Sequence, residues 1–157
     1  MHQRHKKTRE IKGNIWDYHD VTKTWIVVPT NGFVKSTGEC VMGRGLALDA
    51  KLRFPDLPFE LGARIKEYGN VVFTFWDYHI ITFPVKHNWW EKADLALVEK
   101  SAKDLKEILR YNLSQIQTPI YVPWVACGNG KEKKENVRPI LEKYLNEEDK
   151  FIVIDNE

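Results

Sequence analysis

Lys86 is the residue of this sequence whose type and place best suit chemistry. It ends the run Phe-Pro-Val-Lys, which follows an apolar strand pattern, so its amine is expected to reach a cleft beyond the strand end. An amine there can pair with a phosphate, or act in chemistry where desolvation lowers its pKa. From spacing alone, a solvated surface charge is the more ordinary interpretation. His87 beside it is interpreted as a bystander and not as a ligand.

Two glycine-rich turns have the arrangement of an anion site. One turn, residues 38–45, joins a strand pattern to a helix pattern, and a second, Cys-Gly-Asn-Gly at 127–130, does the same later in the chain. Glycine lets the backbone approach a ligand, and the first amides of a helix point outward with partial positive charge. Two such turns predict two phosphate sites, as a diphosphate requires, although each is also a common turn. Residues 43–45 are not a complete dinucleotide fingerprint, and no Walker lysine-serine pair follows them.

Cysteine and tryptophan side chains offer further chemistry. Cys127 has no histidine at a readable spacing, so a small buried thiol is favoured over a nucleophile. Cys40 and Cys127 are far apart and have no second cysteine or histidine at metal spacing, which predicts a reducing, cytoplasmic setting and no bound metal. Trp89 and Trp90 either stack on a base or pack on the domain surface, and the sequence does not separate these alternatives.

Length and composition predict one globular domain. The chain has 157 residues, of which 43% are apolar and 12% aromatic. The 24 basic and 22 acidic residues are interspersed and leave a net charge of +2, which argues against a strong, non-specific nucleic-acid binder. No apolar run approaches the roughly 20 residues of a membrane helix, so no membrane partner is expected. Residues 1–10 are basic and are interpreted as a flexible terminus, with a nucleic-acid arm as the alternative.

Hydrophobic periodicity then predicts the elements that position these groups. Strands and helices alternate, with one hairpin between residues 71 and 85, so we expect an α/β domain with helices on both faces of a mixed sheet. Ligands of such sheets bind beyond the strand ends. The expected strands are 11–15, 25–28, 71–76, 79–85, 118–125 and 151–154, and the expected helices are 46–54, 56–68, 93–113 and 136–145.

Proline, glycine and asparagine predict where several elements begin and end. Pro29 is expected to end its strand, and Pro58 lies near the start of its helix. Gly69 is placed for a left-handed cap just past that helix. Asn136 is a plausible N-cap, and Pro139 then falls in the first turn, where a proline is tolerated.

Taken together, these segments resemble the macro domain family, which binds ADP-ribose. The resemblance implies a three-layer α/β/α fold with a mixed, mostly parallel sheet over residues 11–157, after the flexible segment 1–10. Within the family the chain looks closest to the branch of the DNA ADP-ribosyl glycohydrolase antitoxins and the terminal ADP-ribose glycohydrolases. The segments that carry the resemblance are Gly-Asn-Ile at 13–15, Val-Pro-Thr-Asn at 28–31, Val-Met-Gly-Arg-Gly-Leu-Ala-Leu at 41–48, Phe-Pro-Val-Lys at 83–86 with the run 90–94, and Cys-Gly-Asn-Gly at 127–130 with Val-Arg-Pro-Ile at 137–140.

The resemblance implies a role for each matching residue. Asn14 stands where the family usually has an aspartate that accepts from the adenine amino group. Asn31 and the loop 43–45 would hold the distal ribose and the near phosphate, the turn 128–130 would wrap the diphosphate, and Lys86 would act at C1″ of the distal ribose. No cofactor and no metal are implied. The implied site is Lys86 as the catalytic residue, with Asn14, Ile15, Asn31, Met42, Gly43, Arg44, Gly45, Leu46, Ala47, Gly128, Asn129 and Gly130 binding ADP-ribose.

Departures from the family pattern keep three functions open. The position of a catalytic aspartate in terminal glycohydrolases is Gly130 here, with Glu132 nearby, and residues 33–37 lengthen the first loop relative to the antitoxins. The first hypothesis is a hydrolase that removes ADP-ribose from DNA, protein or a small derivative. The alternatives are a non-catalytic reader of ADP-ribose and a phosphatase of ADP-ribose 1″-phosphate. Lys86 favours hydrolysis, and the lack of an evident acid-base partner favours the reader.

Overall fold

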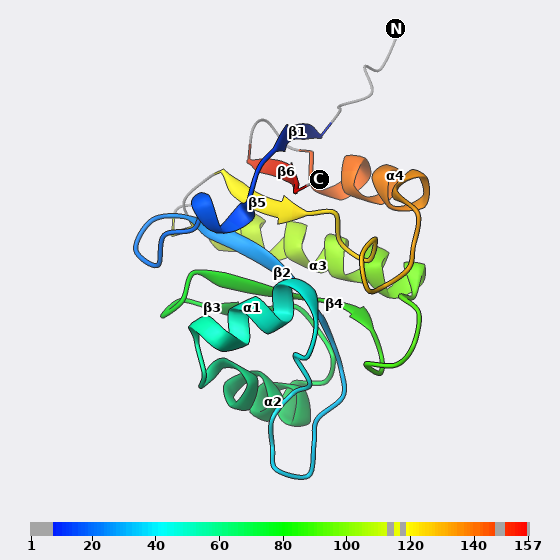
Figure 1. Ribbon diagram of the computed structural model, residues 1–157. Helices are drawn as coiled ribbons and strands as arrows, with labels where there is room; N and C mark the ends of the chain where they lie inside the picture. Colours follow the sequence, from blue (N-terminus) through cyan, green and yellow to red (C-terminus); the bar gives the residue numbers. More distant parts are fainter. Residues whose placement is uncertain (1–7, 113–114, 117–118, 147–149, 157) are drawn as a thin grey trace, which may run out of the picture.

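The computed structural model describes residues 8–112, 115–116, 119–146 and 150–156, and contains a six-stranded sheet in the order β1-β6-β5-β2-β4-β3 (Figure 1). Among the described residues, β3 pairs antiparallel with β4 and the four other neighbouring pairs are parallel. The predicted mixed, mostly parallel sheet is therefore confirmed. The strands are β1 (Arg9–Lys12), β2 (Trp25–Asn31), β3 (Phe73–Phe75), β4 (Ile80–Lys86), β5 (Ile120–Pro123) and β6 (Phe151–Asp155).

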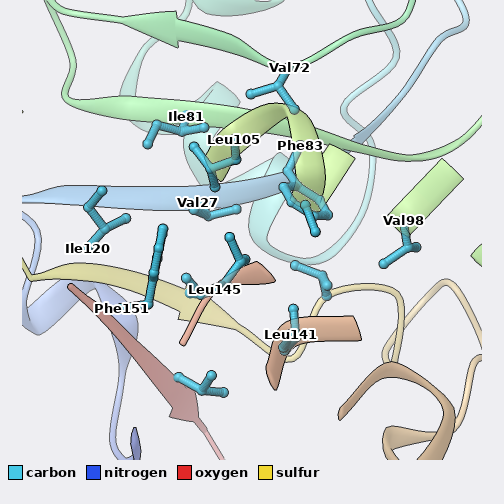
Figure 2. Close-up of a cluster of buried hydrophobic side chains, with 14 of the residues drawn as sticks. Val27, Val72, Ile81, Phe83, Val98, Leu105, Ile120, Leu141, Leu145 and Phe151 are labelled. Atoms are coloured by element: carbon cyan, nitrogen blue, oxygen red, sulfur yellow. The ribbon is translucent and has the colours of Figure 1, made fainter. Parts of the chain in front are cut away.

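Helices cover both faces of this sheet, as expected. They are α1 (Gly45–Arg53), α2 (Leu57–Tyr68), α3 (Leu95–Asn112) and α4 (Lys134–Tyr144), with a 3-10 helix, η1 (Ile15–Asp17). Successive strand residues face opposite layers: Val27 and Ile81 pack with α3 and α4, whereas Ile26 and Ile80 pack with α1 and α2. Figure 2 shows the first of these cores, in which Val27, Ile81 and Leu105 lie together. The arrangement is the expected three-layer α/β/α fold.

The first strand is displaced from its predicted place. It spans Arg9–Lys12 and not residues 11–15, because Gly13 turns the chain and Ile15 begins η1. The Asn14 side chain caps η1 by accepting from the backbone N–H of Trp16 at 3.0 Å. Residues 9–10 of the expected flexible terminus thus belong to the sheet, and residues 1–7 lie outside the described residues.

Pro29 does not end β2, which continues to Asn31. In the described residues β2 pairs with β5 at Trp25 and Ile26, whereas its pairing with β4 runs on to Asn31. From Pro29 onward one side of β2 is therefore an edge, where a missing N–H breaks no ladder bond. A tertiary pairing of this kind is not visible in the local sequence.

The start of α4 also differs from the prediction. Lys133 is the N-cap residue and α4 begins at Lys134, so Asn136 lies in the first turn and Pro139 lies inside the helix. The cause is Glu132, whose Oε1 accepts from the backbone N–H of Lys133 at 3.0 Å and from Asn136 Nδ2 at 2.9 Å. The carboxylate takes over the capping that Asn136 was expected to provide.

Other boundaries agree more closely. Pro58 lies in the first turn of α2, and Gly69 caps its end with φ of +90°, which favours glycine, although its ψ of −178° is extended and not left-handed helical. The predicted hairpin is β3 and β4, joined by a turn that ends at His79 with φ of +53°. The predicted ends at residues 113 and 118 lie outside the described residues. No helix in the described ranges is long and apolar enough to cross a membrane.

One edge of the sheet gathers most strand ends. The five parallel strands β1, β6, β5, β2 and β4 all point their carboxyl ends to this edge, and the segments that follow them turn back over it (Figure 1). The edge is formed by the last residues of these strands and by the loops beyond them. A ligand site is expected here on topological grounds.

Candidate functional site

A pocket of about 700 Å³ opens at this edge of the sheet. Its walls come from the segment after β1, the ends of β2 and β4, the start of α1 and the turn between β5 and α4. The structure brings every residue of the predicted site to it. These are Asn14, Ile15, Asn31, Met42, Gly43, Arg44, Gly45, Leu46, Ala47, Lys86, Gly128, Asn129 and Gly130.

The start of α1 presents unpaired amides to the pocket. Arg44 is the N-cap residue, with an extended backbone and no side-chain hydrogen bond to the first turn. Gly45 follows with φ of +58°, a conformation that favours glycine. The N–H groups of Gly45, Leu46 and Ala47 lack helical partners and lie at the positive end of the helix dipole. This helix start is therefore suited to an anion.

The turn at 127–130 forms the opposite wall. Ala126 and Lys131, on either side of it, have positive φ values of 66° and 59°, and within the described chain the N–H groups of residues 128–130 donate to no backbone carbonyl. Gly130 is packed so tightly that a Cβ there would lie 2.4 Å from the carbonyl oxygen of Ala126. An aspartate at this position, as in terminal glycohydrolases, does not fit this backbone.

The two turns approach each other closely. A Cβ added to Gly45 would lie 2.8 Å from Asn129 Nδ2. Two sets of backbone donors thus face one volume from opposite sides. This arrangement suits a ligand with two adjacent anionic groups.

Lys86 lies between these turns at the end of β4. Its Nζ donates to the carbonyl oxygen of Asn129 at 3.0 Å and to that of Trp89 at 3.4 Å. Burial lowers the pKa of the amine, and the positive charges of Arg44 and Lys131 lower it further. Loss of hydration and like charges both disfavour the ammonium form. Lys86 is therefore a half-buried, hydrogen-bonded amine of lowered pKa and not a fully solvated surface charge.

A second residue fixes the backbone of Lys86. Asn70 Nδ2 donates to the Lys86 carbonyl oxygen at 3.0 Å, and a Cβ on Gly32 would lie 2.7 Å from the Asn70 side chain. Sequence analysis missed Asn70, because it precedes β3 and reaches this place only through the fold. His87 points elsewhere: its Nε2 lies 2.9 Å from Asp94 Oδ2, and it does not line the pocket.

Two asparagines of the predicted site already use their side-chain groups within the protein. Asn31 Nδ2 donates to the carbonyl oxygen of Val41 at 2.9 Å, and its Oδ1 accepts from Phe33 N–H at 2.9 Å. These two hydrogen bonds of Asn31 therefore stabilise the loop between β2 and α1, which lines the pocket. Asn14 Oδ1 accepts the cap bond from Trp16 described above.

Glu132 and Cys127 are poor candidates for catalysis. The Glu132 side chain is 5% exposed, pairs with Lys92 Nζ at 3.6 Å and does not line the pocket. The hydrogen bond from Asn136 is the main cause of its lowered pKa. Cys127 does line the pocket, but burial raises its pKa to about 11, so it is a thiol at neutral pH. Among the described residues no group of three or more histidine, cysteine, aspartate or glutamate side chains is arranged to hold a metal ion.

Several pocket residues were not predicted. Trp16, Asp49, Trp124, Lys134 and Asp155 line the end near Asn14, and Phe33, Lys35 and Trp89 line the end near Lys86. Trp124 directly follows β5, and Asp155 is the last residue of β6. The signal that identifies them is therefore their place at the carboxyl ends of parallel strands.

Comparison with known proteins gives the fold. No protein-family model matches the sequence, and no curated protein matches it either. The structure is similar to the macrodomain of Thermus aquaticus DarG, with 24% identity over 96% of this chain and 97% of that one, and a TM-score of 0.71. The Mycobacterium tuberculosis DarG macrodomain is 23% identical, over 96% of this chain and 99% of that one, with a TM-score of 0.68. Thermosipho africanus DarTG in complex with ADP-ribose is 21% identical, over 93% of this chain and 41% of that one, with a TM-score of 0.71. This chain therefore has the macrodomain fold.

Proposed function

We propose that this protein binds ADP-ribose and hydrolyses an ADP-ribosyl linkage at the distal ribose. The observation that carries the proposal is that two turns, at 43–45 and 128–130, meet around the amine of Lys86. Within the described residues, the backbone N–H groups of these turns donate to no backbone carbonyl. The structural likeness to Thermosipho africanus DarTG, a protein in complex with ADP-ribose, supports the same ligand here.

The lining residues and the volume of the pocket support this ligand. The start of α1 and the turn at 128–130 supply donors for two phosphates, and helix starts and glycine turns are recurrent phosphate sites. The volume of about 700 Å³ lies within the range of small-molecule and cofactor sites. With the diphosphate between the two turns, the base of ADP-ribose is expected near Asn14 and Ile15, and the distal ribose is expected near Lys86.

Hydrolysis at C1″ exchanges one bond for another. The bond from C1″ to the attached group breaks, the oxygen of water bonds to C1″, and the attached group leaves with a proton. Lys86 takes part in one of two ways. As the neutral amine it displaces the attached group from C1″, and water then hydrolyses the Lys86–C1″ adduct and frees the amine; as the ammonium it donates the proton with which the attached group leaves. The lowered pKa of Lys86 supports the first of these roles, because more of the amine is neutral at a given pH.

The catalytic end of the pocket contains no carboxylate and no histidine among the described residues. The two carboxylates that line the pocket, Asp49 and Asp155, lie at the Asn14 end. Lys86 therefore acts with water and with backbone groups. A non-catalytic reader would need no amine of lowered pKa at this point, so Lys86 favours the hydrolase over the reader.

Exposed aromatic side chains at the Lys86 end favour DNA over protein as the carrier of ADP-ribose. Trp90 is 59% exposed and Trp89 is 47% exposed, and their rings meet edge to face at 5.5 Å. Phe33 contacts Trp90 in the same way at 5.5 Å. Exposed aromatic rings near lysine and arginine side chains suit unpaired bases, which stack on them. We infer that the preferred substrate is ADP-ribosylated single-stranded DNA.

Calorimetric titration tests the binding part of this proposal. ADP-ribose is expected to bind in the micromolar range, which corresponds to about 8 kcal/mol, and AMP and NAD are the controls. If ADP-ribose gives no heat and does not shift the thermal unfolding of the protein, the two turns have only a structural role.

Turnover assays then separate the hydrolase from the other functions. Wild type and Lys86→Ala are compared on ADP-ribosylated single-stranded DNA, on ADP-ribosylated protein and on ADP-ribose 1″-phosphate. The hydrolase is expected to release ADP-ribose from DNA and to lose at least about 100-fold in rate with Lys86→Ala. Binding without turnover of any substrate would identify a reader, and release of phosphate alone would identify a phosphatase. Lys100→Ala, on α3 beside Asp104, is the matched lysine control.

A further inference from the structure

The two ends of the pocket differ in charge. Lys86 lies at one end, and the positive charge of Arg44 acts on it. The carboxylates that line the pocket within the described residues, Asp49 and Asp155, lie at the other end with Asn14, and Lys134 beside them offsets one of the two negative charges. Because carboxylates accept hydrogen bonds, the Asn14 end suits the part of a ligand that carries hydrogen-bond donors.

Asn14 is a weak acceptor for such a donor. Its Oδ1 accepts from the backbone N–H of Trp16 at 3.0 Å as the N-cap of η1. This bond determines which way the amide is turned, so its other group is the Nδ2 donor. The exocyclic amine of adenine is also a donor, and two donors do not pair. An amine donor of a ligand at this end therefore needs an acceptor other than Asn14.

Asp155 has the position and the chemistry for this task. It is the last residue of β6, and the N–H of Gly13, next to Asn14, donates to its backbone carbonyl at 3.0 Å. Its side chain is 14% exposed and lines the pocket. Asp155 Oδ2 accepts from Lys134 Nζ at 2.9 Å, which orients the carboxylate. A carboxylate has about four acceptor sites, so it can accept from a ligand in addition to its protein partners.

Asp49 is less suitable than Asp155. It is an exposed residue on α1, and its Oδ2 lies 3.4 Å from the indole N–H of Trp16, at the long limit of a hydrogen bond. An exposed carboxylate is hydrated and gains less from a ligand than a half-buried one. Asp49 therefore serves as the matched control for Asp155.

We propose that Asp155 is the residue that selects adenine, by accepting a hydrogen bond from its exocyclic amine. The inference rests on the proposed function, which identifies this end of the pocket as the base end. Hypoxanthine carries a carbonyl oxygen where adenine carries the amine. That oxygen is an acceptor and is repelled by the carboxylate, so the inosine analogue of ADP-ribose is discriminated against.

The experiment compares two ligands on four proteins by calorimetry. ADP-ribose and inosine diphosphate ribose are titrated into wild type, Asp155→Asn, Asp49→Asn and Asn14→Ala, and thermal unfolding is recorded for each. Wild type and Asp49→Asn are expected to prefer ADP-ribose by about tenfold to hundredfold, the range of one charge-assisted hydrogen bond. Asp155→Asn is expected to bind both ligands within about threefold, because an amide can turn to donate or to accept.

The ratio of the two affinities separates recognition from a structural role. If Asp155→Asn acts only by breaking the ion pair with Lys134, the variant has a lower unfolding temperature and binds both ligands more weakly by the same factor. An Asp155→Asn variant that keeps the wild-type preference overturns the inference, as does a preference that disappears in Asn14→Ala alone. Equal binding of both ligands by wild type overturns the inference but leaves the proposed function intact. Binding of neither ligand overturns the proposed function itself.

Discussion

The amine of Lys86 donates a hydrogen bond to the backbone carbonyl of Asn129 over 3.0 Å. This bond joins the end of β4 to the glycine turn between β5 and α4, which are distant in sequence. No carboxylate among the described residues forms an ion pair with Lys86, so its pKa is lowered by burial and by its cationic neighbours. An ion pair would have raised it. The neutral carbonyl therefore holds the amine in place without the rise in pKa that an ion pair would cause.

The first prediction concerns the pH dependence of hydrolysis. The ordinary lysine pKa of 10.5 is lowered in Lys86, so the neutral fraction grows as the pH rises through that lower value. If the neutral amine is the active form, kcat/KM increases with pH, and the midpoint of this limb of the profile lies below pH 10.5. Arg44→Gln and Lys131→Gln each remove a charge that lowers the pKa, so each moves the limb to higher pH. The measurement is a pH profile of kcat/KM for all three proteins.

Lys66→Gln is the control for this profile. Lys66 is exposed on α2 and does not line the pocket, so its loss changes the net charge equally but leaves the pH of the rise in kcat/KM unchanged. A profile that Arg44→Gln and Lys131→Gln leave unmoved would show that another group determines the pH dependence.

The second prediction concerns Gly45. A valine there is strained because φ is +58°, and its Cβ would meet Asn129 Nδ2 at 2.8 Å, inside the gap between the two turns. Gly45→Val is expected to weaken ADP-ribose by at least about tenfold and to cost about 1–2 kcal/mol of folding stability. Calorimetry and chemical denaturation measure the two effects.

Gly38 supplies the matched control for that strain. Its φ is +97°, but a Cβ there meets nothing within 4 Å, and it does not line the pocket. Gly38→Val should lose comparable stability and keep its affinity for ADP-ribose. Equal loss of affinity in both variants would mean that strain, and not the filled gap, weakens the ligand.

The layers, and the meeting of the two glycine turns at one edge of the sheet, could be predicted from the sequence because they depend on local patterns. Alternating apolar residues place Ile26 and Val27 in opposite cores, and the glycines of the two turns follow strands whose ends meet at one edge. Topology then brings the predicted residues to one pocket. The predictions that were wrong concern details that depend on contacts between segments distant in the sequence.

Pro29 and Asn136 illustrate this dependence. Pro29 lies within a strand because β5 does not pair beside it, and Asn136 lies within a helix because Glu132 caps it earlier. Asn70 was missed for the same reason. Asp155 directly follows the expected strand 151–154, which is a usable signal, but its contacts also depend on the fold. The Asn70 side chain reaches Lys86 from the segment before β3, and Asp155 meets Gly13 across the β1–β6 pair. A single sequence without the fold contains no local mark of either contact.

The third prediction concerns stability and Glu132. Hydrogen bonds from Asn136 and from Lys133 N–H hold the pKa of this carboxyl below its ordinary value of 4.5. A lowered folded-state pKa contributes stability that is complete above the unfolded-state value and is lost as the pH falls through the folded-state value. Glu132→Gln is therefore expected to lower the unfolding temperature at pH 7, and this deficit is expected to shrink as the pH falls below 4.5 toward 3.

The control for Glu132 is a glutamate of the same helix start. Glu135 is 72% exposed and lies 3.9 Å from Lys133 Nζ, so Glu135→Gln should change the unfolding temperature little at either pH. Thermal unfolding of the three proteins at both pH values is the measurement. A Glu132→Gln deficit of equal size at pH 7 and pH 3 would point to lost packing and not to the charge.

The fourth prediction concerns the aromatic side chains beside the Lys86 end. Trp90 contacts Phe33 and Trp89 but does not line the pocket, so Trp90→Ala should leave the affinity for free ADP-ribose unchanged. With ADP-ribosylated single-stranded DNA, loss of one stacked base is worth about 1–3 kcal/mol, so KM should rise by about fivefold to 150-fold. Tyr111→Ala is the control, since Tyr111 is 81% exposed on α3 and away from the pocket. If Trp90→Ala raises KM for an ADP-ribosylated protein as much as for the DNA, the aromatic side chains do not recognise bases, and the preference for DNA is wrong.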